Sequence, residues 1–128
     1  MANPPAHDRA VRLLKEKLPT DEVHSIVLFG SVARGDAGPE SDIDLLVIYD
    51  GSFETKRRFQ DITYDIGLEN SLLAQSVFFK PEGFEREVRW RSYFAQDVIS
   101  QGIVLHDDGT YRGICRESLK AGSGVPER

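Results

Sequence analysis

Four short apolar runs alternate with polar segments along the chain of 128 residues. Each run contains β-branched or aromatic residues and is bounded by turn residues, which is typical of strands buried in a sheet. The runs are HSIVLF (24–29), IDLLVIY (43–49), LLAQSVFF (72–79) and IVLH (103–106). They predict a sheet of about four strands.

The polar segments between these runs carry apolar residues at helical spacing. The first segment predicts a helix with Asp8 as its N-cap and Pro19 after its end. Its apolar stripe consists of Ala10, Val11, Leu14 and Leu18. A single long helix is predicted to start at Pro81 and to end near Gly102, its C-cap. Its stripe consists of Phe84, Val88, Arg91, Ala95 and Val98 or Ile99.

Residues 55–70 fit two patterns. The stretch ITYDIGL (62–68) alternates like a strand, whereas Phe59, Ile62 and Ile66 have helical spacing. The following run, 72–79, is the better strand, so a helix from about 55 to 70 is favoured. The predicted order is α-β-α-β-α-β-α-β. This order indicates an α/β (α+β) fold, a mixed sheet with helices packed on it.

Composition narrows the class of protein. A chain of this length forms one domain, predicted over 1–107, and the polar extension 108–128 is expected to be partly disordered. The formal net charge of −5 argues against strong nucleic-acid binding. Neither a signal peptide nor a membrane span is indicated, so a cytoplasmic protein with no membrane partner is expected. Cys115 is the only cysteine, and the three histidines (His7, His24 and His106) are interpreted as surface or edge residues.

The dipeptide Gly30-Ser31 directly follows the first predicted strand. A glycine at a strand end lets the backbone turn sharply and lets another group approach closely. If a short helix starts here, its free N–H groups and the Ser31 hydroxyl form an anion pocket suited to phosphate. Arg34 lies one helical turn further on, where it can contact a phosphate or form a salt bridge to Asp36 or Glu40.

Two aspartates stand at the start of the second predicted strand. Residues i and i+2 of a strand point to the same face, so the carboxylates of Asp42 and Asp44 lie side by side. Their mutual repulsion is relieved by a divalent cation, and hard oxygen ligands suit Mg²⁺. A structural interpretation, two solvated aspartates capped by Ser41, is the alternative.

These two motifs together carry a family resemblance. Gly30-Ser31-x-x-Arg34-Gly35, followed by Ser41-Asp42-x-Asp44-Leu45, resembles the signature of nucleotidyltransferases with the DNA polymerase beta-like fold. The short length is similar to the minimal nucleotidyltransferase (MNT) branch, whose members often pair with a helical HEPN protein. The resemblance implies that Gly30 and Ser31 hold the phosphates of a nucleoside triphosphate, expected to be ATP, and that Asp42 and Asp44 bind catalytic Mg²⁺.

The implied reaction is attack by an acceptor hydroxyl on the α-phosphate, with transfer of a nucleoside monophosphate, expected to be AMP, and release of pyrophosphate. The family usually has a third carboxylate on the next strand. Here LLAQSVFF contains no acid, and Gln75 occupies the expected position. Asp65 or Glu69 could replace it only if ITYDIGL is the strand. An antitoxin-like enzyme acting on a HEPN-type partner is the leading hypothesis, and a weak or inactive MNT-fold binding module is the alternative.

An aromatic and basic segment, REVRWRSYF, lies within the long predicted helix. Trp90, Tyr93 and Phe94 could stack on a base, or they could simply be part of an amphipathic helix with Phe94 packed inside. If a partner protein docks, this segment is the first candidate. A homodimer is also compatible with the sequence.

Overall fold

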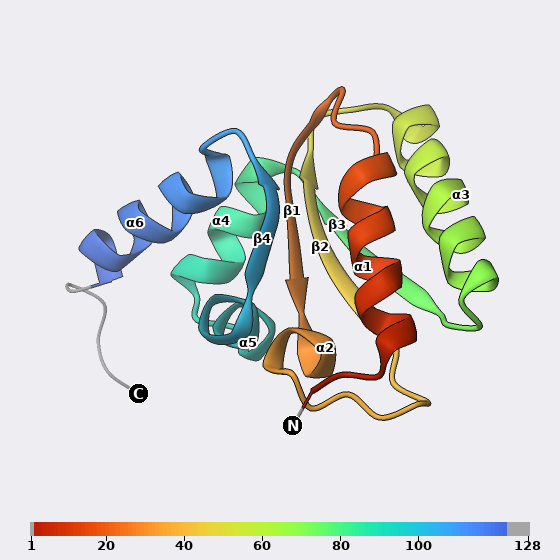
Figure 1. The fold of residues 1–128 in the computed structure, drawn as a ribbon. Coiled ribbons are helices and arrows are strands. Elements are labelled where there is room, and N and C mark those ends of the chain that lie inside the picture. Colours follow the sequence, from red (N-terminus) through yellow and green to blue (C-terminus); the bar gives the residue numbers. More distant parts are fainter. Residues whose placement is uncertain (1, 123–128) are drawn as a thin grey trace.

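A four-stranded sheet lies between two layers of helices (Figure 1). The structure, a computed structural model, describes residues 2–122, with side chains as far as Glu117. The strands are β1 (Val23–Phe29), β2 (Ile43–Tyr49), β3 (Ala74–Phe79) and β4 (Ile103–Asp107). The helices are α1 (Pro5–Lys17), α2 (Gly30–Arg34), α3 (Phe53–Glu69), α4 (Pro81–Arg89), α5 (Tyr93–Gln101) and α6 (Thr110–Gly122).

The sheet is mixed, as the sequence predicts. Its strand order is β3-β2-β1-β4, with β2 and β3 parallel and the other two pairs antiparallel. The parallel pair requires a crossover, which α3 provides. Because β1 and β2 run in opposite directions, the end of β1 and the start of β2 lie at the same end of the sheet. The register places Asp44 between Phe29 of β1 and Gln75 of β3.

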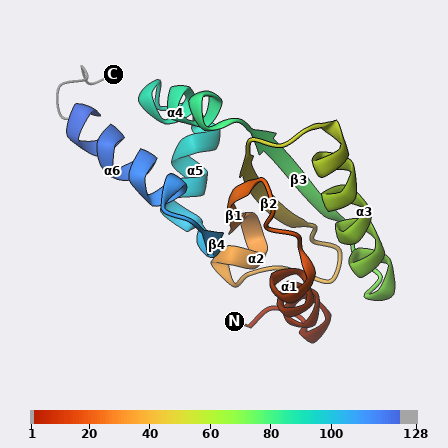
Figure 2. The same cartoon turned by 90° about the horizontal axis from the view of Figure 1, so that it is seen from above.

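Each face of the sheet has its own helical cover (Figure 2). On β2, Ile43, Leu45 and Val47 belong to a core formed with α1 and α3. Leu46 and Ile48 belong to a second core, formed with α4, α5 and α6. Since both faces are covered, the strand has a continuous apolar run instead of an alternating pattern.

The ambiguous segment is a helix, as favoured from its spacing. Helix α3 begins after Ser52, whose hydroxyl accepts a hydrogen bond from the N–H of Thr55 as an N-cap. Asp65 and Glu69 are exposed on this helix. The helix packs on the face of the sheet that carries Leu45, whereas Asp44 points to the other face. Neither acid can therefore be the third carboxylate beside Asp44.

The first helix begins earlier than predicted. Pro4 is the N-cap of α1 and Pro5 is its first residue, so Asp8 lies in the first turn and is not the cap. A proline fits this position because its ring fixes φ near the helical value and because the first turn needs no N–H donor there. Asp8 still carries a favourable negative charge near the helix N-terminus.

The long helix predicted from Pro81 is two helices, so that prediction is wrong. Helix α4 ends at Arg89 and α5 starts at Tyr93, with Arg91 between them at a φ of 57°. The Ser92 hydroxyl accepts a hydrogen bond from the N–H of Ala95 at 3.1 Å and so caps α5. Arg91 is exposed in this junction and is not part of a buried stripe.

Helix α6, over Thr110–Gly122, was not predicted from the sequence. The carboxylate of Asp107 accepts hydrogen bonds from the N–H groups of Tyr111 and Arg112 at 3.1 and 3.2 Å, which anchors the start of the helix. The Tyr111 ring stacks on Phe84 of α4, with ring centroids 5.7 Å apart. The last six residues of the extension that was expected to be partly disordered, 123–128, lie outside the described part of the chain. Among the described helices, none is long and apolar enough to cross a membrane.

Candidate active site

The predicted phosphate and metal residues lie together at one end of the sheet. Gly30 follows β1 and starts α2, the short helix that the Gly-Ser pair predicts. Asp44 is the second residue of β2, and Asp42 lies just before this strand. Gln75 is opposite Asp44 in the parallel register, and its Nε2 donates a hydrogen bond to Oδ2 of Asp42 at 2.6 Å. Two carboxylates and one amide therefore form a single polar cluster.

Gly30 is required here for two physical reasons. Its φ of 81° lies in the left-handed region that side chains disfavour. A Cβ atom at this position would also overlap the Oδ2 atom of Asp44. The sequence predicts that some group approaches this glycine closely, and the structure shows that the group is the Asp44 carboxylate.

The electrostatics of the cluster indicate a shortage of positive charge. Burial raises the pKa of Asp44, the nearby charge of Asp42 raises it further, and Arg34 lowers it only in part. A charged pair of this kind is stabilised by a cation that accepts hard oxygen ligands. The donor set therefore fits Mg²⁺, with Asp42 and Asp44 as the charged ligands. Among the described residues, no group of three or more His, Cys, Asp or Glu side chains could hold a metal.

Arg34 and Ser31 both lie in α2. Arg34 forms a salt bridge to Asp36, with Nε and Oδ2 3.3 Å apart. Of the two predicted partners, Asp36 and Glu40, Asp36 is therefore the one in contact. Its Nη1 also donates a hydrogen bond to Oε1 of Gln101 at 3.1 Å. Ser31 is the second residue of α2 and is half-buried. The chain thus places all five predicted site residues around one strand-to-helix turn.

This arrangement agrees with comparisons to known proteins. Residues 8–104 match the nucleotidyltransferase domain family. The chain belongs to this family. A putative protein adenylyltransferase of Methanocaldococcus jannaschii is 32% identical to this nucleotidyltransferase domain over 96 residues, which are 75% of this chain and 90% of that protein.

Three solved structures share the nucleotidyltransferase fold. The first is a toxin–antitoxin with AMP-PNP, with a TM-score of 0.56 and 18% identity over 93% of this chain and 88% of that chain. The second is the MntA–HpeT toxin–antitoxin with two Asp-to-Glu substitutions, with a TM-score of 0.57 and 16% identity over the same shares. The third is MntA–HpeT with a Tyr-to-Ala substitution, with a TM-score of 0.54 and 19% identity over 92% and 86%. They confirm the predicted fold.

Three residues that support the site were not predicted. Gln101 at the end of α5 accepts hydrogen bonds from α2, through Gly30 and Arg34. His7 is only 1% exposed, and its Nε2 donates to the carbonyl oxygen of Ser41 at 2.8 Å, one residue before Asp42. Asn3 Oδ1 accepts a hydrogen bond from the N–H of Ala37 at 3.0 Å. No local pattern reveals such partners, because they are 34 to 71 residues apart in the chain.

The interpretation of the three histidines as surface or edge residues is wrong for His7. His7 is buried in the nucleotidyltransferase core beneath the loop before β2. His24 is half-buried at the opposite end of the sheet, where its two ring nitrogens each lie 2.6 Å from a carboxylate, of Asp50 and of Asp108. His106 is half-buried on the edge strand β4, as an edge residue should be.

The aromatic and basic segment is divided between core and surface. Phe94 packs edge-to-face on Phe29, with ring centroids 5.4 Å apart, which confirms the structural interpretation for this residue. Trp90 and Tyr93, at the junction of α4 and α5, are 67% and 88% exposed. These two large side chains therefore remain free to contact another molecule.

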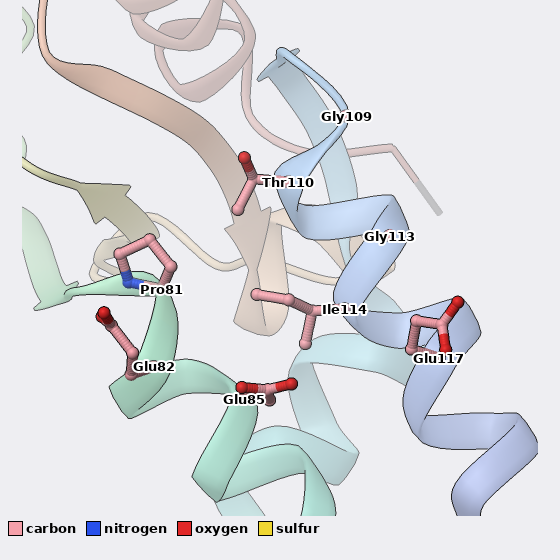
Figure 3. A pocket seen from close by; sticks show the side chains of 8 residues that line it. All are labelled: Pro81, Glu82, Glu85, Gly109, Thr110, Gly113, Ile114 and Glu117. Carbon is pink, nitrogen blue, oxygen red and sulfur yellow. The ribbon is translucent and has the colours of Figure 1, made fainter.

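A separate hollow lies between α4 and α6 (Figure 3). In the close-up view Ile114 of α6 lies across from Glu85 of α4, and Glu117 lies nearby on α6. The lining residues are Pro81, Glu82, Glu85, Gly109, Thr110, Gly113, Ile114 and Glu117. The predicted site residues of the nucleotidyltransferase motif are not among them, so this hollow is distinct from the candidate active site.

Proposed function

We propose that this protein transfers AMP from ATP to an acceptor hydroxyl in a Mg²⁺-dependent reaction. The observation that carries the proposal is the contact between the Gly30 turn and the Asp44 carboxylate, with Asp42 beside it. The proposed phosphate-binding turn and metal-binding pair are therefore in direct contact, as transfer of a nucleotidyl group requires. The name of the archaeal relative and the AMP-PNP in one related structure support adenylyl transfer from ATP.

Each site residue has a role in this proposal. Gly30 and Ser31 bind the β- and γ-phosphates, and Arg34 adds positive charge beside them. Asp42 and Asp44 hold Mg²⁺, which when bound offsets the negative charge of the triphosphate and of the carboxylate pair. His7 and Asn3 hold the loop that leads into Asp42. Most of the catalytic contribution is then the positioning of charge.

The proposed reaction breaks one phosphoanhydride bond and forms one phosphoester bond. The oxygen of the acceptor hydroxyl forms a bond to the α-phosphorus, the bond from this phosphorus to the bridging oxygen breaks, and pyrophosphate leaves. The hydroxyl proton must also be removed. Gln75 cannot accept it, because a neutral amide has no basic site at neutral pH. Solvent, a phosphate oxygen or a group on the partner therefore takes the proton.

The acceptor is proposed to belong to a HEPN-type helical partner protein. This proposal is supported by the structural neighbours of the chain, which are chains of toxin–antitoxin complexes. The exposed Trp90 and Tyr93 offer a docking surface, since aromatic residues are enriched at protein interfaces. Phe94, next to Tyr93 in α5, packs on Phe29, which pairs with Asp44, so this surface is close to the site.

A second function, an inactive binding module, is favoured by one specific observation. Gln75 occupies the position beside Asp42 and Asp44 where the third carboxylate is expected. A protein with this site could still bind Mg-ATP and a partner while it transfers AMP slowly or not at all. The two functions differ in turnover and share the nucleotide site.

One experiment distinguishes them. Mg-ATP affinity is measured by calorimetry, and transfer of radiolabelled AMP is measured with and without the partner. For Asp44→Asn we expect Mg-ATP affinity to fall by at least about 100-fold, because changes to second-shell residues alone typically cost about 10- to 100-fold. Asp65→Asn, an exposed acid on the other face, is the matched control. Binding without any transfer to the partner selects the binding module, and absence of Mg-ATP binding in the wild-type protein rejects both.

A further inference from the structure

Two donors of the phosphate-binding turn point at the same side-chain oxygen. The N–H of Gly30 donates to Oε1 of Gln101 at 3.2 Å, and Nη1 of Arg34 donates to the same atom at 3.1 Å. Gln101 is the last residue of α5, and α5 lies beside α2 in Figure 1. The packing of two helices therefore creates this contact, and the local sequence does not.

A backbone N–H and a guanidinium that converge on one oxygen are a typical arrangement for binding an anion. An amide oxygen is neutral, and hydrogen bonds to it are about half as strong as those to a charged phosphate oxygen. We infer that Gln101 is an internal stand-in for a phosphate oxygen, which the nucleotide displaces when it binds. This inference rests on the proposed function, because it assumes that the Gly30 turn receives the triphosphate.

The position of Gly30 supports this inference. The Asp44 carboxylate lies against its α-carbon, and the Gln101 oxygen accepts from its N–H. Gly30 therefore separates the Gln101 oxygen from the Asp44 carboxylate. Any group that replaces this oxygen would lie close to the proposed metal ligands. A phosphate oxygen at this place would accept from the donors of α2 and would lie near Asp44, one of the two residues that would hold a cation.

The fold allows the side chain of Gln101 to leave without moving the helix. The next residue, Gly102, is fixed by a hydrogen bond from its N–H to the carbonyl oxygen of Val98 at 2.7 Å. A Cβ on Gly102 would lie 2.8 Å from Cγ1 of Val27, so the backbone packs tightly on β1 at this point. Gln101 itself is half-buried. Rotation of the Gln101 side chain is therefore enough to release the N–H of Gly30 and the guanidinium of Arg34.

Substitution of Gln101 tests the inference directly. Gln101→Glu places a carboxylate on the same two donors, which binds them more strongly and repels phosphate. We expect its affinity for Mg-ATP to fall by about 10-fold or more. Gln101→Ala removes the competing oxygen, and we expect affinity to rise about 3-fold to 10-fold, the range for a net hydrogen bond. Gln96→Glu and Gln96→Ala, at an exposed position of α5, are the matched controls and should bind like the wild type.

Two ligands separate the phosphate contact from the rest of the nucleotide. Inorganic tripolyphosphate should show the same order of affinities as Mg-ATP, whereas adenosine should bind equally to all variants. Weaker binding of tripolyphosphate by Gln101→Ala would overturn the inference, since Gln101 would then position the donors and not compete for them. Unchanged binding by Gln101→Glu would overturn it as well. If Gln101→Glu does not fold, Gln101→Ala decides alone, and failure of the wild-type protein to bind Mg-ATP rejects the proposed function instead.

Discussion

Single residues decide how close the charged groups of this site can come to one another. Gly30 combines a positive φ with a direct contact to Asp44, so one missing side chain permits both the turn and the approach. The sequence alone predicts the turn, the aspartate pair and the position of Gln75. It cannot predict Gln101 or His7, because their contacts arise only when α5 and α1 pack.

The first residue-scale prediction concerns Gly30→Ala. We expect the free energy of unfolding to fall by about 1–3 kcal/mol because of the positive φ, and Mg-ATP binding to be lost because Asp44 is displaced. Gly109→Ala is the control: its φ is 108°, but a Cβ there would meet no atom within 4 Å. It should lose stability and keep nucleotide affinity. Urea denaturation and calorimetry measure the two effects, and normal Mg-ATP binding by Gly30→Ala would contradict the assigned role of this contact.

The second residue-scale prediction concerns Gln75→Asp. The new carboxylate lies beside Asp42 and can act as both a metal ligand and a general base. We expect AMP transfer in the presence of the partner to rise by about 10²- to 10⁴-fold, the usual contribution of a general base. Without Mg²⁺ the variant should be less stable, because three acids then repel one another.

Gln75→Asn is the matched control, since it has the same size as the aspartate variant and carries no charge. Its transfer rate should stay at the wild-type level. Equal transfer rates for the aspartate and asparagine variants would show that the missing carboxylate at position 75 does not limit the rate of AMP transfer.

At the scale of elements, the sequence is most informative where one physical factor dominates. The central strands β1 and β2 are predicted because their runs are mainly apolar, as burial on both faces requires. The edge strands β3 and β4 are less buried and are predicted from their β-branched and aromatic residues. The break between α4 and α5 is missed because the helical spacing of the apolar residues continues across Ser92. In the folded chain the Ser92 hydroxyl caps α5 and starts a new helix there. Helix α6 is missed although Asp107, Asp108 and Thr110 are typical residues for a helix start.

At the scale of the whole molecule, the two ends of the sheet have different tasks. The end at Gly30 carries the candidate active site. The end at His24 joins three segments, because His24 at the start of β1 contacts Asp50 after β2 and Asp108 before α6. A functional site with mutually repelling carboxylates reduces stability locally, so contacts at the far end can help to maintain the fold.

The last prediction is that this far end makes stability depend on pH. Hydrogen bonds to Asp50 and Asp108 raise the pKa of His24 above its usual 6.5, more than burial lowers it. Its stabilising contribution is therefore complete below pH 6.5 and is lost as the pH rises through the folded pKa. Burial raises the pKa of Asp108, but hydrogen bonds from Thr110 and His24 outweigh it and lower the pKa to about 2, so this contribution is lost only in strong acid.

Thermal unfolding of the wild type and of His24→Gln at pH 6 and pH 9 tests this prediction. The melting temperature of the wild type should fall more between pH 6 and pH 9 than that of the variant. The reason is that only protonated His24 can donate to both carboxylates at once. His106→Gln, a half-buried histidine on β4, is the control and should keep the wild-type difference. The same pH dependence in His24→Gln and in the wild type would mean that another group titrates, and that the three segments are held together mainly by apolar packing.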